Sequence, residues 1–407
     1  MRQDLLELLK KHNQLHLMDF YNKLDDAGKT AMEDQISMID WNYLRTVEEH
    51  IAPERGVITP LTETVSTADI RERKAEYREK GLAAIRAGKV GAMLLAGGMG
   101  TRLGCSGPKG VVDIGLTHPL FIFECLFHNT MGVVKEAGAW IPFFIMTSDK
   151  NHEETIAFLK EHDYFGYNPE YIYFFRQDMA PCIDYERRLL MEGPGQLAIS
   201  PNGNGGWYTS FARAGLAEKA RAMGVEWLNC FAVDNVLQRI CDPLFVGAMI
   251  DSGCVSGSKV VRKADPKEKV GVLCLEDGRP SIVEYYELTD EMAYAKNEKG
   301  EYSYTFGVIL NYLFRVDVLD RIVNEDLPMH IVEKKIPYMD ADGTMHHPTS
   351  PNGYKFETLI LDMVHLMDNC LAYEVVREHE FAPIKNATGV DSIESARELL
   401  VKNGVEL

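Results

Sequence analysis

The sequence predicts an α/β protein whose open, mixed and mainly parallel sheet is flanked by helices, with a small helical part at the N-terminus. Two observations carry this prediction. From Lys89 onward, short apolar runs alternate with amphipathic stretches of helical length, which is the rhythm of repeated βαβ units. The apolar runs show no polar alternation, so we expect strands that are buried on both faces, as in a parallel sheet between two layers of helices.

The individual elements follow from hydrophobic periodicity. The first 50 residues carry apolar side chains at helical spacing and predict short helices, and a charged helix is expected over residues 68–88. The alternating part predicts strands at 90–97, 140–148, 171–177 and 225–233, with helices at 119–138, 151–162 and 206–224.

After Ser256 the pattern becomes more antiparallel. A strand at 259–263 precedes a hairpin over 270–288, in which Asp277-Gly278 supplies the turn. A late helix at 354–369 and a strand at 371–378 follow. We expect an N-terminal helical region (1–70), a catalytic domain (71–390) and a short C-terminal segment (391–407).

Composition narrows the classes of function. The 407 residues carry a net charge of −18 and show no basic cluster, which argues against nucleic acid as a partner. The eight cysteines form no CxxC pair. No apolar run reaches membrane-spanning length, and the polar N-terminus lacks the apolar core of a signal peptide. We therefore expect a cytoplasmic protein that has no membrane partner.

The most informative stretch is "VGAMLLAGGMGTRLGCSGPKG", residues 90–110. It fails the dinucleotide pattern G-x-G-x-x-G because Leu103 occupies the third glycine position, and it lacks the Gly-Lys-Ser/Thr of a P-loop. Glycines after a buried strand let the backbone turn sharply and expose its amides. Arg102 and Lys109 could then bind phosphate oxygens, although a purely structural turn would also use these glycines.

This stretch resembles the signature of the eukaryotic-type UDP-sugar pyrophosphorylases, above all the UDP-N-acetylhexosamine pyrophosphorylases. The arginine after Gly-Thr is usually missing from the related UDP-glucose pyrophosphorylases. Four further segments are similar to the family in the same order, between roughly residue 80 and residue 390: "SPNGNGGWY" (200–208), "FAVDNVLQRICDP" (231–243), "KVVRKADPKEKVGVLCLEDGRPSIVEYYEL" (259–288) and "EFAPIKNATG" (380–389).

The resemblance implies a Rossmann-like nucleotidyltransferase fold and a Mg²⁺-dependent uridylyltransferase. Such an enzyme converts UTP and a sugar 1-phosphate into a UDP-sugar and pyrophosphate, here UDP-N-acetylhexosamine and above all UDP-N-acetylglucosamine. Three alternatives stay open: a UTP-glucose-1-phosphate uridylyltransferase, a broad UDP-sugar pyrophosphorylase, and a regulator that binds a UDP-sugar without turning it over.

The resemblance also assigns roles to single residues. Asp234 would bind Mg²⁺, and the phosphates would meet Arg102, Lys109 and Lys385. The nucleotide would contact Ala96, Gly97, Gly98, Gln177, Gly203 and Asn204. The sugar would contact Gly271, Glu284 and Asn311.

Three positions depart from the family pattern near the sugar. Val308 stands where family members usually carry an asparagine, and Leu359 and Leu361 replace two aromatic residues. The sugar is therefore left open among N-acetylglucosamine, N-acetylgalactosamine, glucose and less usual ones.

Overall fold

The computed structural model describes residues 1–49, 55–325 and 327–407; residues 50–54, where the predicted N-terminal helices end, and residue 326 lie outside it. The chain divides into two compact units, and each unit draws on several separate stretches. Unit 1 comprises Met1–Glu54, Asp178–Gly206 and Asp326–Ile360, and unit 2 comprises Arg55–Gln177, Trp207–Glu325 and Leu361–Leu407. The predicted domains, by contrast, were contiguous.

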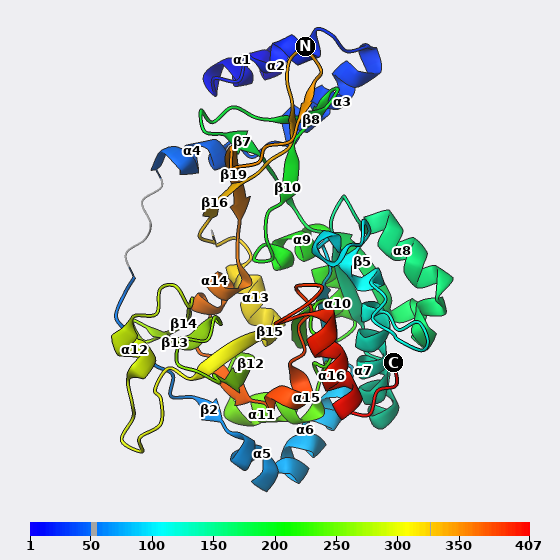
Figure 1. The fold of residues 1–407 in the computed structure, drawn as a ribbon. Coiled ribbons are helices and arrows are strands. Elements are labelled where there is room, and N and C mark those ends of the chain that lie inside the picture. Colours follow the sequence, from blue (N-terminus) through cyan, green and yellow to red (C-terminus); the bar gives the residue numbers. More distant parts are fainter. Residues whose placement is uncertain (50–54, 326) are drawn as a thin grey trace. The chain divides into compact units, whose positions relative to one another are not determined.

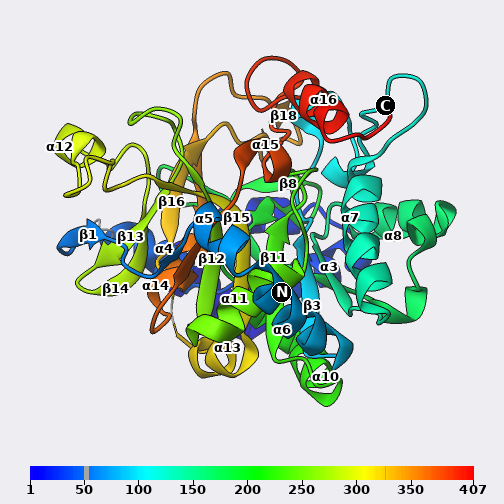
Figure 2. The ribbon, with the colours of Figure 1, turned by 90° about the horizontal axis from the view of Figure 1, so that it is seen from below.

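Unit 2 contains an 11-stranded sheet (Figures 1 and 2). Its main path runs β2-β20-β12-β15-β11-β3-β4-β5. All neighbours on this path are parallel except β15, which is antiparallel to both β11 and β12. The predicted fold class, a mixed and mainly parallel α/β sheet, is confirmed. The strands are β1 Ile58–Pro60, β2 Thr64–Val65, β3 Val90–Leu95, β4 Phe143–Thr147, β5 Ile172–Arg176, β11 Trp227–Ala232, β12 Ser256–Arg262, β13 Val272–Glu276, β14 Arg279–Val283, β15 Phe306–Arg315 and β20 Leu371–Glu374.

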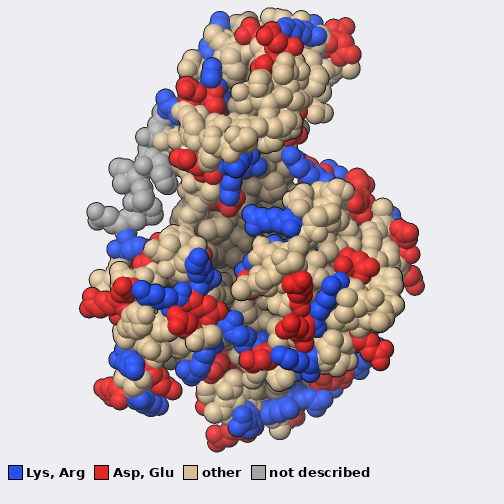
Figure 3. Space-filling model, viewed as in Figure 1, with Lys and Arg blue, Asp and Glu red and all other residues tan. Residues whose placement is uncertain are grey.

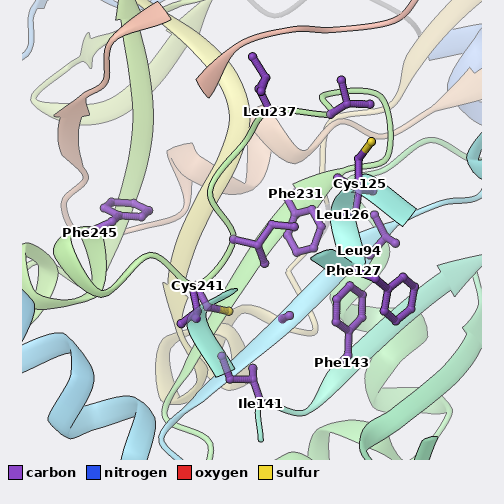
Figure 4. Close-up of a cluster of buried hydrophobic side chains, with 14 of the residues drawn as sticks. Leu94, Cys125, Leu126, Phe127, Ile141, Phe143, Phe231, Leu237, Cys241 and Phe245 are labelled. Carbon is purple, nitrogen blue, oxygen red and sulfur yellow. The ribbon is translucent and has the colours of Figure 1, made fainter. Parts of the chain in front are cut away.

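Helices surround this sheet, and one face of it holds a large apolar core. Every residue of β3 and β4 is buried, which explains their uninterrupted apolar sequences. In this core Phe127 stacks on Phe143, with ring centroids 4.9 Å apart, and Phe143 meets Phe231 edge-on (Figure 4). The helices are α5 Thr67–Glu72, α6 Lys74–Arg86, α7 Ile122–Ala137, α8 His152–Glu161, α9 Trp207–Arg213, α10 Leu216–Ala222, α11 Pro243–Ser252, α12 Asp290–Tyr294, α13 Val316–Ile322, α14 Ile360–His365 (its first residue belongs to unit 1), α15 Arg377–Glu380 and α16 Ile393–Lys402.

Unit 1 combines the N-terminal helices with three small sheets. Its apolar core joins helix residues such as Leu9 and Ile36 to Leu189 and Phe356 from distant stretches. The buried side chain of Gln14 strengthens this union, because its amide donates to the carbonyl of Arg187 and accepts from the N–H of Leu189. The elements are α1 Gln3–Lys11, α2 Leu17–Tyr21, α3 Asp26–Met38, α4 Asn42–Glu49, β6 Met179–Pro181, β7 Ile183–Asp184, β8 Met191–Gly193, β9 Gln196–Leu197, β10 Ile199–Pro201, β16 His330–Lys334, β17 Tyr338–Met339, β18 Met345–His346 and β19 Gly353–Glu357.

Three predicted helices need correction. The helix expected over 68–88 is divided at Arg73 into α5 and α6. The helix expected over 206–224 is broken into α9 and α10 by Gly215, whose φ is +74°. The helix expected over 354–369 is wrong in its first part, where residues 353–357 form β19 and pair with β16. Tertiary pairing overrode the helical periodicity there. The antiparallel hairpin is confirmed, and its turn residues Asp277 and Gly278 both have positive φ, as a type I′ turn requires.

Charged side chains of both signs are intermixed over the face drawn in Figure 3. All eight cysteines carry free thiols. None of the helices in the described part of the chain combines the length and the hydropathy that crossing a membrane would require.

Helices α6 and α11 approach each other closely at two glycines. A Cβ built on Gly81 would lie 1.9 Å from the carbonyl oxygen of Pro243, and one on Gly247 would lie 1.8 Å from that of Tyr77. Backbone atoms cannot yield as a flexible side chain can, so any larger residue must push the two helices apart.

We therefore expect Gly81→Ala to lower the free energy of unfolding by about 1–3 kcal/mol, since it overpacks this contact. The matched control is Gly132→Ala in α7, where a Cβ meets no atom within 4 Å. It should raise the free energy of unfolding by about 0.5–1 kcal/mol because alanine favours the helix. Urea unfolding followed by circular dichroism measures both, and equal gains for both variants would contradict the close contact.

Candidate active site

Four parallel strands of unit 2 end at the same edge of the sheet, which we call the carboxyl edge. The register aligns Leu95 of β3 with Ala232 of β11 and with Met146 of β4, and β5 continues the row. The residues that follow these strands therefore emerge side by side. They are Ala96–Gly98 after β3, Ser148 after β4, Gln177 after β5 and Asp234 shortly after β11.

The glycine turn after β3 is held through its carbonyl groups. The hydroxyl of Ser148 donates to the carbonyl of Gly97 at 2.9 Å, and the amide of Asn151 donates to those of Ala96 and Gly98 at 2.9 and 3.2 Å. By contrast, the N–H groups of Gly97 and Gly98 find no acceptor among the described residues. The turn is thus fixed from its acceptor side and keeps two backbone donors for a ligand.

Gln177 lies directly against this turn. A Cβ on Gly97 would come within 2.3 Å of its Nε2 atom, so glycine is needed for the close approach. The side chain is 7% exposed, and its amide makes no hydrogen bond within the part of the chain that the structure describes. Its oxygen and nitrogen do not belong to the fully buried unpaired polar atoms of the described residues, so both ends of the amide stay open to a ligand with a complementary donor–acceptor edge.

Lys109 and Asp234 face each other at this site. Their Nζ and Oδ2 atoms are 3.8 Å apart, which is too long for a hydrogen bond but close enough for electrostatic attraction. Burial lowers the pKa of Lys109, and the positive charges of Lys385 and Arg102 lower it further, while Asp234 opposes the shift. Two cations of the glycine-rich loop and one cation from the C-terminal part of the chain therefore act on one another here.

The two remaining cations differ in exposure. Arg102 is exposed on a short 3-10 turn, Thr101–Leu103. Lys385 is half-exposed, and its Nζ lies 3.2 Å from Asp391 Oδ2. The backbone N–H of the preceding Ile384 donates to the carbonyl of Asp234 at 2.9 Å, which brings the C-terminal motif to the carboxyl edge.

The predicted sugar residues separate into two groups. Gly271 and Glu284 are neighbours on the β13–β14 hairpin, where a Cβ on Gly271 would lie 3.7 Å from Glu284 Cδ and 3.5 Å from Val308 Cγ2. Asn311 lies elsewhere and is fully buried. Its amide donates to Gln238 Oε1 and accepts from Asn229 Nδ2. Protein groups therefore occupy both ends of the Asn311 amide, and this side chain lies in the protein interior.

Gly203 and Asn204 belong to unit 1. Gly203 has a φ of +88°, and a Cβ there would lie 2.2 Å from the carbonyl oxygen of Thr358. The side-chain oxygen of Asn204 accepts the N–H of Ile360 at 2.9 Å. Their predicted contact with a nucleotide stays a prediction.

Sequence reasoning missed the residues that support the glycine turn, Ser148 and Asn151. A signal for them was present, because "TSDKN" places polar residues directly after the buried strand that neighbours β3. Such residues at the ends of adjacent parallel strands are expected to meet.

Comparison with known proteins agrees with this geometry. The chain is 37% identical to UDP-N-acetylglucosamine diphosphorylase 2 of Arabidopsis thaliana, covering 98% of this chain and 83% of the relative. It is 38% identical to UDP-N-acetylglucosamine pyrophosphorylase of Saccharomyces cerevisiae, covering 99% and 85%. Among solved structures, the UDP-N-acetylglucosamine pyrophosphorylase of Trypanosoma brucei in complex with an inhibitor superimposes with a TM-score of 0.82 at 25% identity, covering 97% of this chain and 83% of that one.

The family described as UTP–glucose-1-phosphate uridylyltransferase matches residues 30–403. That match includes the glycine turn, Lys109, Asp234 and Lys385, whose arrangement at the carboxyl edge has just been described. The chain belongs to this family.

Proposed function

We propose that the protein transfers the uridylyl group of UTP to an N-acetylhexosamine 1-phosphate, N-acetylglucosamine 1-phosphate above all, and releases pyrophosphate. The observation that carries the proposal is the convergence of Arg102, Lys109 and Lys385 beside Asp234 and the glycine turn. A protein that only binds a UDP-sugar has less need for this set of cations, because the diphosphate of a UDP-sugar carries fewer negative charges than UTP or than a UDP-sugar together with free pyrophosphate. The names of the relatives support the same activity.

In the proposed reaction, an oxygen of the sugar phosphate attacks the α-phosphorus of UTP. A new P–O bond forms, the bond between the α-phosphorus and the bridging oxygen to the β-phosphate breaks, and the electron pair leaves with pyrophosphate. Negative charge grows on the leaving group, so Arg102, Lys109 and Lys385 contribute by neutralising it. Losing one such preorganised group typically costs about 3–4 kcal/mol of transition-state stabilisation.

At the uridine end, the proposed contacts are the free N–H groups of Gly97 and Gly98 and the unpaired amide of Gln177. The amide can pair with a uracil edge, which carries both a donor and acceptors. Because Ser148 and Asn151 already hold the turn, little ordering is left for the moment of binding.

The residues fit a magnesium ion shared with the substrate. Mg²⁺ is usually bound through one or two carboxylates together with phosphate oxygens and water. Asp234 offers one partly exposed carboxylate, and the described residues contain no group of three or more His, Cys, Asp or Glu that could hold a metal by itself. When bound, Mg²⁺ would neutralise phosphate charge.

One observation favours a second acceptor, glucose 1-phosphate. The space beside Gly271 is already lined by Ile282 Cγ2 at 3.0 Å and Val308 Cγ2 at 3.5 Å from an added Cβ. Val308 also offers no side-chain hydrogen bond to a sugar. A smaller sugar without an acetamido group would need less room there.

The deciding experiment incubates the purified protein with UTP, Mg²⁺ and a panel of sugar 1-phosphates, and measures pyrophosphate. We expect release with N-acetylglucosamine 1-phosphate and none when Mg²⁺ is chelated. Faster release with glucose 1-phosphate would favour the second acceptor. A folded protein that releases no pyrophosphate with any sugar, yet binds a UDP-sugar tightly, would be a regulator instead.

Replacing the proposed metal ligand should abolish turnover. We expect Asp234→Asn, which keeps the shape but removes the charge, to lower kcat by more than about 100-fold because it removes transition-state stabilisation of the size typical for an electrostatic group. Asp317→Asn is the matched control: its carboxylate pairs with Arg315 beyond the end of β15, at the opposite edge of the sheet. Near-normal rates for Asp234→Asn would refute the metal assignment.

The pH dependence of the reaction rate should report the deprotonation of Lys109. Burial and the neighbouring cations lower its pKa, so the free enzyme loses this positive charge at a lower pH than an ordinary lysine would. We therefore expect kcat/KM for pyrophosphate in the reverse reaction to fall as the pH rises through that lowered pKa. Lys109→Arg should move this alkaline limb to higher pH, because arginine stays protonated. If the wild type and Lys109→Arg lost kcat/KM over the same alkaline pH range, Lys109 would be excluded as the group whose titration causes that loss.

A further inference from the structure

The residue after Asp234 makes an unusual pair of contacts. Asn235 is 2% exposed, and its side-chain amide uses both ends on the backbone of one distant segment. Its Nδ2 donates to the carbonyl of Glu380 at 2.8 Å, and its Oδ1 accepts the N–H of Ala382 at 2.9 Å. A side-chain amide can donate from its nitrogen and accept at its oxygen at the same time without carrying a charge.

These contacts join the two segments that carry the proposed catalytic groups. Asp234 precedes Asn235 directly, and Lys385 lies three residues beyond Ala382. The two segments form only an isolated bridge, Asn235 to Pro383, rather than a ladder of strand pairs. Few backbone hydrogen bonds fix their register, the shortest being that from Ile384 to Asp234. The Asn235 side chain therefore supplies two of the contacts that set how Lys385 stands relative to the Asp234 carboxylate.

Each of the two segments that the Asn235 amide connects is fixed to the sheet by other side chains. On the Asp234 side, Gln238 donates from Nε2 to the carbonyls of Ala232 and Asn235 at 2.7 and 2.9 Å. Gln238 is in turn held by the buried amide of Asn311. A buried polar network in which every member is satisfied holds its parts in one arrangement. This explains why Asn311, which the sequence suggested for the sugar, is fully buried.

On the Lys385 side, the carboxylate of Glu380 lies 2.5 Å from the buried ammonium of Lys259, which also contacts Asp242 at 3.1 Å. This group ties residue 380 to β12 through side chains. It leaves the register between residues 380–385 and Asp234 to the two bonds of the Asn235 amide and to two backbone hydrogen bonds, from Ile384 to Asp234 at 2.9 Å and from Val236 to Ala382 at 3.4 Å.

We propose that Asn235 is a positioning residue for the uridylyl transfer: its amide holds Lys385 in place relative to Asp234. The proposal rests on the proposed function for its kinetic consequence. Its structural core, the register between the two segments, does not depend on which sugar is used.

A double-mutant cycle tests whether Asn235 acts through Lys385. We expect Asn235→Ala to lower kcat by about 100-fold, the size that a misplacement of about 1 Å can cost, with less than about threefold change in KM for UTP. In a Lys385→Ala background the same change should lower kcat by less than about fivefold, because coupled residues are not additive. If the two effects simply multiply, Asn235 acts on the fold in general and the proposal is wrong.

Two further variants control for damage to the fold. Asn369→Ala removes a side-chain bond to the N–H of Val255 at 2.8 Å, between segments that carry none of the three cations or Asp234; it should leave kcat unchanged. Asn235→Asp keeps the shape and the acceptor for Ala382 but cannot donate to Glu380. It should lower kcat as well, and a wild-type kcat for this variant would overturn the proposal.

A crystal structure of Asn235→Ala gives an answer that does not need activity. We expect the Cα of Lys385 to move by more than about 1 Å relative to that of Asp234, the scale of misplacement that matters for catalysis. An unmoved segment would overturn the proposal even if the enzyme were slow. If the wild type released no pyrophosphate with any sugar 1-phosphate, the proposed function would fail, while this structural result would still stand or fall by itself.

Discussion

The candidate site depends on one constraint: the glycine turn after β3 is held through its carbonyl groups, which leaves its N–H groups available. Ser148 and Asn151 make this possible, since they emerge at the end of β4 and reach the carbonyls of Ala96, Gly97 and Gly98. Their position follows from the parallel register of β3 and β4. Without that register the turn would have no support, and its flexible glycines would cost conformational entropy whenever a ligand bound.

Charge at the site is organised locally. The chain carries a net charge of −18, which by itself repels a triphosphate. Attraction must therefore come from the few cations gathered at the carboxyl edge, where burial and then the charges of Lys385 and Arg102 lower the pKa of Lys109. The negative charge of Asp234 offsets part of the repulsion among these cations, and its carboxylate is available to bind a divalent metal ion. The arrangement is suited to a ligand that brings several negative charges together with a divalent metal.

Much of the fold could be predicted because apolar runs without alternation indicate buried parallel strands, and β3, β4, β5 and β11 all lie where they were expected. The loop motifs could be placed at one edge for the same reason. The burial of Asn311 and its bonds to Asn229 and Gln238 could not be read from the sequence, because a motif does not reveal which way a side chain faces; its sugar contact stays a prediction. The division into two units could not be predicted from the sequence either, because contacts such as that between Gln14 and Leu189 link residues far apart in the chain. The helix expected over 354–369 failed because β16 offered its first residues a strand partner.

The most direct test of this account is a crystal structure of the protein with UTP and Mg²⁺. The account predicts uracil against Gln177 and the glycine turn, hydrogen bonds from the N–H groups of Gly97 and Gly98, and the triphosphate next to Lys109 with the metal on Asp234. A nucleotide bound elsewhere on the chain, with the carboxyl edge of the sheet left empty, would contradict it.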